Sequence, residues 1–517
     1  MTARNRATNQ QTLFNISSIW INRVVLILIP LISTPLITNT FGLEVAGIWF
    51  LASIFGYQLL LLEIGISTSL VRLLAKKNIF MSKEKSFKII STAFFSLTFV
   101  SFFLIFGIEK ITQYFILAFD IPDVAISDTK VLIYIIVISI AINLPCRIGY
   151  SIFSSRHRFD IVQVIDTIGQ VIKLISIIAL FKLATPTIFL LGAIVFGISS
   201  LISVILFIYS IKFYSFDFSN ITFKNFSIKY LKKILSLSGA AFIITLSSMI
   251  LLQLSSFLVG IYISPKYVPL IAIPIMILNS ITPFFQAFST ITGPIAAGVS
   301  NLSEKKELYE NFKYFSLYST SLCLFSLVTL LIAGRPLLEI WLLGDQVSVN
   351  DIETIYKVLL ILLGAFSLSF SSALGKSVLV SVGNHWKSAL IDLFTSVLAI
   401  LIGVFLMIYT DLGLMGMIIG MGICYLTRGI FIYPSLLSKY FNVSVLNFFR
   451  MSILAPVIIY AILILFIKIV HSFLSDNYGN IEILAMYLFL SILIIILNYM
   501  FIIKKEHKLK IANFFKF

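Results

Sequence analysis

The chain has little charge. Only 12% of its 517 residues are charged, whereas 59% are hydrophobic and the mean hydropathy is +1.05. A typical soluble domain carries about 25% charged residues. A water-soluble core of this composition would expose apolar surface on every side. The scarcity of charge therefore excludes a single soluble globular domain and indicates that lipid surrounds most of the chain.

Cysteine and histidine are also scarce and scattered. They are Cys146, Cys323 and Cys424, followed by His157, His385, His471 and His507. The cysteines lie inside apolar runs without C-x-x-C spacing, and the histidines fall in loops and in the tail. This pattern predicts neither a disulfide framework nor a metal site, and no cofactor is expected.

Signs of nucleotide chemistry are missing as well. Gly375-Lys376-Ser377 resembles the end of a phosphate-binding loop, but position 370 is Phe instead of the required Gly, and no parallel sheet surrounds it. The longest loops on the predicted external side, near 108–130 and 336–353, are too short to fold as catalytic domains. The sequence predicts a transporter and not an enzyme.

Apolar runs account for most of the chain. A membrane-spanning helix needs about 20 mostly apolar residues, and by that rule we expect an all-α polytopic membrane protein with about fourteen spans. The predicted spans are 16–38, 46–70, 87–107, 131–153, 162–182, 187–209, 238–262, 267–293, 313–335, 354–380, 386–409, 412–437, 451–470 and 481–503.

The net charge of +16 is concentrated in one set of loops. Lysines and arginines cluster in alternate short loops and in the C-terminal tail, whereas the opposite loops carry mainly Asp and Glu. Cytoplasmic loops of membrane proteins are enriched in Lys and Arg, so both termini are expected to be cytoplasmic. Because the basic residues lie in short loops beside apolar runs, no nucleic-acid partner is predicted.

An internal repeat organises the chain. Gly149-Tyr150-Ser151 aligns with Gly375-Lys376-Ser377, and Ile165-Asp166 with Ile391-Asp392, at a constant offset of 226 residues. Six spans separate the copies, so both halves should have the same orientation in the membrane. The alternative is chance similarity between apolar helices.

The repeat predicts two six-helix lobes related by a parallel duplication, plus two C-terminal helices. The expected segments are an N-terminal tail at 1–15, lobes at 16–209 and 238–437, a basic linker at 210–237, two further helices within 438–503 and a basic tail at 504–517. In the linker, one face can be shared by Ile228, Leu231, Ile234 and Leu235. That indicates either an amphipathic helix on the anionic leaflet or a plain positive linker.

Ionisable residues inside spans are rare and costly, so each is a functional candidate. They are Arg23, Glu63, Arg147, Asp166, Lys173, Asp392 and Arg428. Similar depth predicts three ion pairs, namely Arg23–Glu63, Arg147–Asp166 and Asp392–Arg428. Lys173 lies near the midplane without a matching acid.

These charges suggest a binding cavity. Arg23, Lys173, Arg147 and Arg428 would attract an anion, and arginine suits phosphate oxygens through its planar fork of donors. Glu63, Asp166 and Asp392 are the candidates for coupling to an ion. The alternative is that the pairs only hold neighbouring helices together and that cations near span ends reach the headgroups.

Prolines interrupt two groups of spans. Pro30 and Pro35 lie in the first span, and Pro274 and Pro283 lie in its repeat counterparts. Proline removes a helix hydrogen bond and permits bending, which predicts a gate. Static kinks, which are common in membrane helices, are the alternative.

Three stretches carry a family resemblance. They are Phe41-Gly42-Leu43-Glu44-Val45-Ala46-Gly47-Ile48-Trp49, Leu62-Glu63-Ile64-Gly65-Ile66 and Leu70-Val71-Arg72-Leu73-Leu74-Ala75. Together with the lobe organisation, they resemble polysaccharide-transport proteins of the multidrug/oligosaccharidyl-lipid/polysaccharide (MOP) exporter superfamily, and within it the Wzx-type O-antigen flippases. The resemblance covers nearly the whole chain. Glu63 stands where such proteins often have Asp.

The resemblance implies a MATE-like fold and a flippase of the bacterial inner membrane. Its substrate would be an undecaprenyl-pyrophosphate-linked oligosaccharide, moved by alternating access for O-antigen and lipopolysaccharide synthesis. Implied partners are membrane lipids, H⁺ or Na⁺ as a coupling ion, and the polysaccharide polymerase and chain-length machinery. Three alternatives stay open: a capsule or other envelope polysaccharide flippase, a cation-coupled multidrug exporter, and a membrane-embedded polymerase or ligase.

Overall fold

The structure is a computed structural model that describes residues 3–75, 82–213, 220–299 and 302–450, and a few residues between 454 and 465. In these ranges the regular structure is helical apart from one isolated bridge between Gly344 and Val347. Eleven helices of the described chain are long and apolar enough to cross a membrane. The all-α polytopic prediction is confirmed. The predicted spans at 451–470 and 481–503 lie almost entirely outside the described residues.

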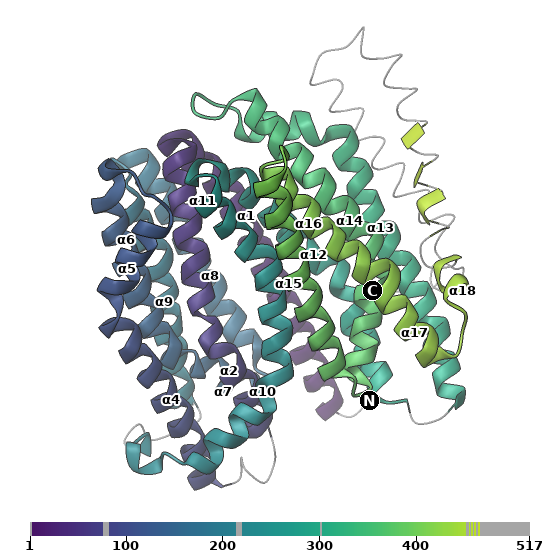
Figure 1. The fold of residues 1–517 in the computed structure, drawn as a ribbon. Helices are drawn as coiled ribbons and strands as arrows, with labels where there is room; N and C mark the ends of the chain where they lie inside the picture. Colours follow the sequence, from purple (N-terminus) through teal and green to yellow (C-terminus); the bar gives the residue numbers. More distant parts are fainter. Residues whose placement is uncertain are drawn as a thin grey trace. The chain divides into compact units, whose positions relative to one another are not determined.

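The chain divides into two compact units, and the first comprises Met1–Met249 and Ser256–Pro269. Its helices, in purple to teal in Figure 1, are α1 (Ala3–Leu59), α2 (Leu61–Leu74), α4 (Lys83–Phe106), α5 (Ile108–Ala118), α6 (Asp123–Cys146), α7 (Ile148–Ser154), α8 (Phe159–Leu183), α9 (Ile188–Phe213), η2 (Phe223–Asn225), α10 (Ile228–Met249), α11 (Ser255–Tyr262) and η4 (Pro265–Tyr267).

The second unit comprises Ile250–Ser255 and Leu270–Phe517. Its described elements are η3 (Ile250–Leu254), α12 (Val268–Ala297), α13 (Leu302–Leu342), α14 (Val349–Ser381), α15 (His385–Tyr409), α16 (Leu414–Leu426), η5 (Thr427–Ile432), α17 (Tyr433–Phe441) and α18 (Val445–Phe449). Two of these, η3 and η5, are π-helical turns.

The first two predicted spans meet at a glycine. Gly42 interrupts α1 with φ 75° and ψ 167°, a backbone conformation that residues with a Cβ rarely adopt. The helix therefore consists of two segments on either side of Gly42, and a second interruption at Leu60 separates it from α2. Pro30 and Pro35 lie inside the first segment, but the break itself occurs at the glycine.

Helix boundaries recur with the offset of the sequence repeat. A shift of 226 residues carries α8 onto His385–Tyr409, which are the bounds of α15. The same shift carries the start of α6 onto Val349, where α14 begins, and the start of α9 onto Leu414, where α16 begins. The repeated glycines also pack closely in both copies: a Cβ on Gly149 would lie 2.6 Å from the Phe207 backbone, and one on Gly375 would lie 2.1 Å from Leu437.

The basic linker continues directly into a transmembrane helix. From Ile228 onward it forms the first turns of α10, which packs on α2, and the Ser69 hydroxyl donates a 2.8 Å hydrogen bond to the Ile234 carbonyl. Ile234 is buried, but Ile228 and Leu235 are 64% and 54% exposed. The predicted apolar face is thus only partly covered, and within the described residues the segment is an extension of the seventh span.

Candidate functional site

Glu63 and Arg147 form an ion pair in the first unit. Glu63 lies in the first turn of α2, and Arg147 is the single residue between α6 and α7. The Arg147 Nε lies 2.9 Å from Glu63 Oε2, and the Ser67 hydroxyl also donates to Glu63. The Glu63 side chain is only 5% exposed, whereas that of Arg147 is 40% exposed. One partner is buried and the other remains accessible.

Asp166 has neutral partners. The Asn22 amide of α1 donates to it at 2.8 Å and also to Thr167 at 3.0 Å, and the Gln170 amide donates to it at 3.1 Å. Asn22 is buried, so this contact helps to hold α1 against α8. Asp166 therefore joins two helices through amide donors.

Lys173 lies seven residues beyond Asp166, on the same face of α8. It is 5% exposed, and its ammonium donates a 2.9 Å hydrogen bond to the Ser199 hydroxyl of α9. Nearby, Asn143 of α6 donates to Ser200 of α9 at 3.0 Å and accepts from Ser203 at 2.5 Å. Polar side chains thus connect α8, α9 and α6 inside the first unit.

Asp392 is the centre of a denser cluster in the second unit. Lys376 of α14 forms an ion pair with it, Arg428 Nε lies 3.7 Å from its Oδ1, and the Tyr433 hydroxyl donates to it at 2.7 Å. Arg428 also donates at 2.6 Å to the hydroxyls of Thr395 and Ser396. These contacts hold α14, α15, η5 and α17 together.

The π-helical turn η5 carries Arg428. A π-turn adds one residue to a helix and rotates the next turn about the helix axis, and such turns are frequent at functional sites. Here the guanidinium reaches Asp392, Thr395 and Ser396 on α15. The exposed fraction of the Arg428 side chain is 14%.

Arg23 differs from the other cations. It lies on α1 beside Asn22, its side chain is exposed, and it forms no ion pair or hydrogen bond with any residue in the part of the chain that the structure describes. Its guanidinium therefore keeps all five N–H donors for a ligand, a headgroup or water.

The depth argument is correct for one pair of the three. The Asp392–Arg428 pair is confirmed, with Lys376 as an additional partner. The Arg23–Glu63 and Arg147–Asp166 pairs are wrong, because Glu63 binds Arg147 and Asp166 accepts from Asn22 and Gln170. The predicted cations are spread over both units, and the roles assigned to Arg23, Lys173, Arg147 and Arg428 stay predictions, as does the proline gate.

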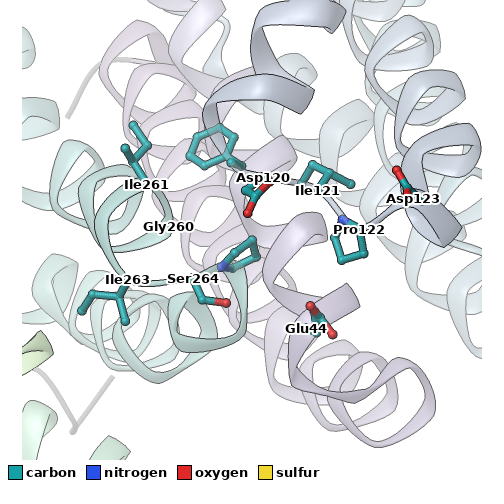
Figure 2. Close-up of a pocket in the computed structure, with 11 residues that line it drawn as sticks. Glu44, Asp120, Ile121, Pro122, Asp123, Gly260, Ile261, Ile263 and Ser264 are labelled. Carbon is teal, nitrogen blue, oxygen red and sulfur yellow. The ribbon is translucent and has the colours of Figure 1, made fainter.

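An acidic cavity of about 450 Å³ lies elsewhere in the first unit. Its walls come from α1 just beyond Gly42, from the turn between α5 and α6, and from the corner between α11 and η4. Figure 2 shows Glu44 on one wall and Asp120 and Ser264 across from it. The three lining carboxylates, Glu44, Asp120 and Asp123, are exposed to solvent.

The corner between α11 and η4 fits closely onto α1. A Cβ on Gly47 would lie 1.9 Å from the Pro265 carbonyl oxygen, so only glycine permits this approach. Gly260 lies against Leu51 and Phe119, and the rings of Phe119 and Phe257 are 5.3 Å apart. Sequence reasoning missed this contact. The stretch that contains Gly42, Glu44 and Gly47 is the part of the sequence that could have pointed to this contact. From the sequence alone it indicates only a family resemblance.

The fold of the described chain is similar to that of solved transporter structures, at low sequence identity. The structure of a lipid II flippase, MurJ, in an inward closed conformation is similar with a TM-score of 0.68 and 18% identity, over 94% of this chain and 97% of that one. A multidrug resistance MATE family transporter matches in its inward-facing conformation (TM-score 0.64, 15% identity, 84% of this chain and 95% of that one).

An outward-facing MATE family transporter is similar as well, with a TM-score of 0.56 and 16% identity over 84% of this chain and 96% of that one. No protein-family model matches the chain. No curated protein matches it in sequence. The comparisons establish the fold, which is that of a helical multi-pass membrane protein.

Proposed function

We propose that the chain is a flippase for a lipid-linked oligosaccharide. In this proposal it moves an O-antigen repeat unit, carried on undecaprenyl pyrophosphate, from the cytoplasmic to the periplasmic leaflet of a bacterial inner membrane. The supporting observation is that, of the seven ionisable candidates inside the predicted spans, Arg23 is exposed and Arg147 keeps 40% of its side chain exposed, and both are cations.

The carboxylates and the arginines inside the spans differ in burial and in their partners. The buried carboxylates of Glu63 and Asp392 are bound by cations and hydroxyls, and Asp166 accepts from two amides. Arg23 is exposed without a partner in the described chain, and Arg147 keeps 40% of its side chain exposed. Arginine binds phosphate oxygens through two parallel N–H donors. A pyrophosphate headgroup is therefore the substrate chemistry that these side chains suit best.

The proposal includes the organisation that the repeat predicts. Two six-helix lobes, 16–209 and 238–437, would move the headgroup by alternating access, with both termini in the cytoplasm. Lys173 and Arg428 are largely buried and are held by hydroxyl or carboxylate partners. They would not contact the substrate but would add positive electrostatic potential along its path. The polysaccharide polymerase and chain-length machinery would receive the product, and H⁺ or Na⁺ would drive the step.

Arg23 provides the first test. Arg23→Ala is expected to lower the rate at which reconstituted protein moves a fluorescent undecaprenyl-pyrophosphate oligosaccharide between leaflets by about tenfold or more. The reason is that hydrogen bonds to a charged group contribute about 1.5–3 kcal/mol. Arg23→Lys should keep the charge and recover part of the rate.

Arg335→Ala is the matched control. Arg335 is also an exposed arginine on a long helix, but it pairs with Glu339 at 3.1 Å. Its replacement should leave the translocation rate unchanged. Equal rates for Arg23→Ala and the unchanged protein, at equal protein level, would remove Arg23 from the substrate path.

A cation-coupled multidrug exporter is the second candidate. The acidic cavity lined by Glu44, Asp120 and Asp123 supports it, since carboxylates attract organic cations. The two functions separate in one measurement with reconstituted protein. Movement of the lipid-linked oligosaccharide supports the flippase, and uptake of a cationic dye in its place supports the exporter.

A further inference from the structure

Two helix interruptions meet at the Glu63–Arg147 pair. The chain breaks at Leu60 just before α2, and it breaks again at Arg147 between α6 and α7. The α2 and α7 helices pack together, and the Ser151 hydroxyl donates to the Ser67 carbonyl at 3.4 Å. Both members of the pair therefore lie at or near a helix interruption, close to a direct contact between α2 and α7.

Glu63 and Arg147 differ in burial and in the number of their contacts. Glu63 is buried, forms an ion pair with Arg147 and accepts a hydrogen bond from Ser67. The Arg147 Nε faces Glu63 in the ion pair, and the guanidinium forms no hydrogen bond with any residue that the structure describes. Four of the five guanidinium N–H donors stay available on a side chain that is 40% exposed.

We propose that Glu63 is the resident counter-ion of Arg147, which the phosphate oxygens of the substrate replace. The inference rests on the proposed function and assigns a headgroup subsite to Arg147. A phosphate offers the same planar, two-oxygen edge as a carboxylate and carries more negative charge, so it competes for the same fork of donors.

The resident carboxylate also promotes release. After the headgroup binds, Glu63 remains buried and is held by Ser67 alone, and an unpaired buried charge is costly. Re-formation of the Glu63–Arg147 ion pair therefore competes with binding of the headgroup. An arginine without this competitor would hold the pyrophosphate longer, and turnover would slow even though binding improved.

The test measures affinity and turnover separately. Purified full-length protein in lipid nanodiscs is titrated with farnesyl pyrophosphate, which carries a pyrophosphate and a short prenyl tail. Glu63→Gln, a near-isosteric change, is expected to bind it about tenfold more tightly, because removing the competing charge-assisted contact is worth about 1.5 kcal/mol. The translocation rate in proteoliposomes should fall in the same variant.

Arg147 variants complete the experiment. Arg147→Ala should lose at least tenfold in affinity, and the double variant with Glu63→Gln should bind as weakly as Arg147→Ala alone. Arg147→Lys should recover part of the affinity, because it keeps the charge without the planar fork. Inorganic pyrophosphate, titrated in parallel, separates recognition of the headgroup from recognition of the prenyl tail.

Glu109→Gln is the matched control. Glu109 also pairs with a cation, since Lys130 lies 3.1 Å away, but both side chains are about half exposed. Its replacement should change neither affinity nor rate. Unchanged or weaker binding in a folded Glu63→Gln variant would overturn the counter-ion assignment.

The inference and the proposed function fail in different ways. Tighter pyrophosphate binding by Glu63→Gln, together with a protein that moves no lipid-linked oligosaccharide, would support the counter-ion assignment and reject the flippase. If the unchanged protein moves the lipid-linked oligosaccharide but Glu63→Gln has an unchanged affinity for pyrophosphate, the flippase is supported and the counter-ion assignment is rejected.

Discussion

Replacing Asp392 by Ala is expected to destabilise the protein by about 3–5 kcal/mol, because removing one partner of a buried ion pair leaves uncompensated charge. Asp392 is 3% exposed, and its carboxylate neutralises Lys376 and lies beside Arg428. Without it, two cations would face each other across α15. The measurement is the midpoint of thermal unfolding in detergent, which should fall clearly, with a lower yield of folded protein.

Asp411→Ala serves as the control for this variant. Asp411 lies in the turn between α15 and α16, is exposed, and makes no ion pair in the described chain. Its replacement should leave the unfolding midpoint unchanged. The same midpoint for both variants would mean that Lys376 and Arg428 do not depend on Asp392.

Gly47→Leu should undock the corner between α11 and η4. Even the Cβ would lie 1.9 Å from the Pro265 oxygen and 2.6 Å from its carbonyl carbon, and both are backbone atoms that cannot rotate away. Overpacking of this kind costs about 1–3 kcal/mol, which corresponds to a shift of about 5- to 150-fold toward the undocked state.

The undocked state can be measured by cysteine labelling. Val268, fully buried beside η4, is changed to Cys in a protein whose three native cysteines are replaced by Ser. Its reaction with a maleimide should be slow with Gly47 and several-fold faster with Gly47→Leu. Gly197→Leu is the control, because a Cβ on Gly197 meets nothing within 4 Å. Equal labelling in both leucine variants would contradict the close fit.

The positions of the helices could be predicted because they depend on composition along the chain. A long apolar run must form a helix in lipid, since every backbone group needs an internal partner there. The predicted span 386–409 lies within one residue of the bounds of α15, and in the structure the repeat offset carries α8 onto α15. One ion pair, Asp392–Arg428, was also found from depth alone.

The remaining pairs could not be predicted from depth. Position along a span fixes the height of a side chain in the membrane, but the direction in which it points depends on how each helix is rotated and where it bends. Arg23 and Glu63 share a predicted depth, yet the break at Leu60 comes just before α2, and Glu63 meets Arg147. Asp166 meets Asn22, an amide that a search limited to charged residues did not consider.

Backbone irregularities were beyond sequence reasoning for a related reason. Prolines are visible in a sequence, but the interruption of α1 occurs at Gly42, and the sequence prediction did not connect Pro434 with the π-helical turn that precedes it. Such departures arise where tertiary contacts outweigh local hydrogen bonding. The close fit of Gly47 against Pro265 is a contact of this kind between residues more than 200 positions apart.

The two copies of the repeated aspartate have different partners. Asp392 is bound to Lys376, Arg428 and Tyr433, whereas the residues one repeat earlier are Tyr150, Ile202 and Phe207, and Asp166 relies on amides. Replacing Asp166 by Asn would therefore keep the contact with α1 through amide partners. Replacing Asp392 by Asn would leave Lys376 and Arg428 without their shared carboxylate.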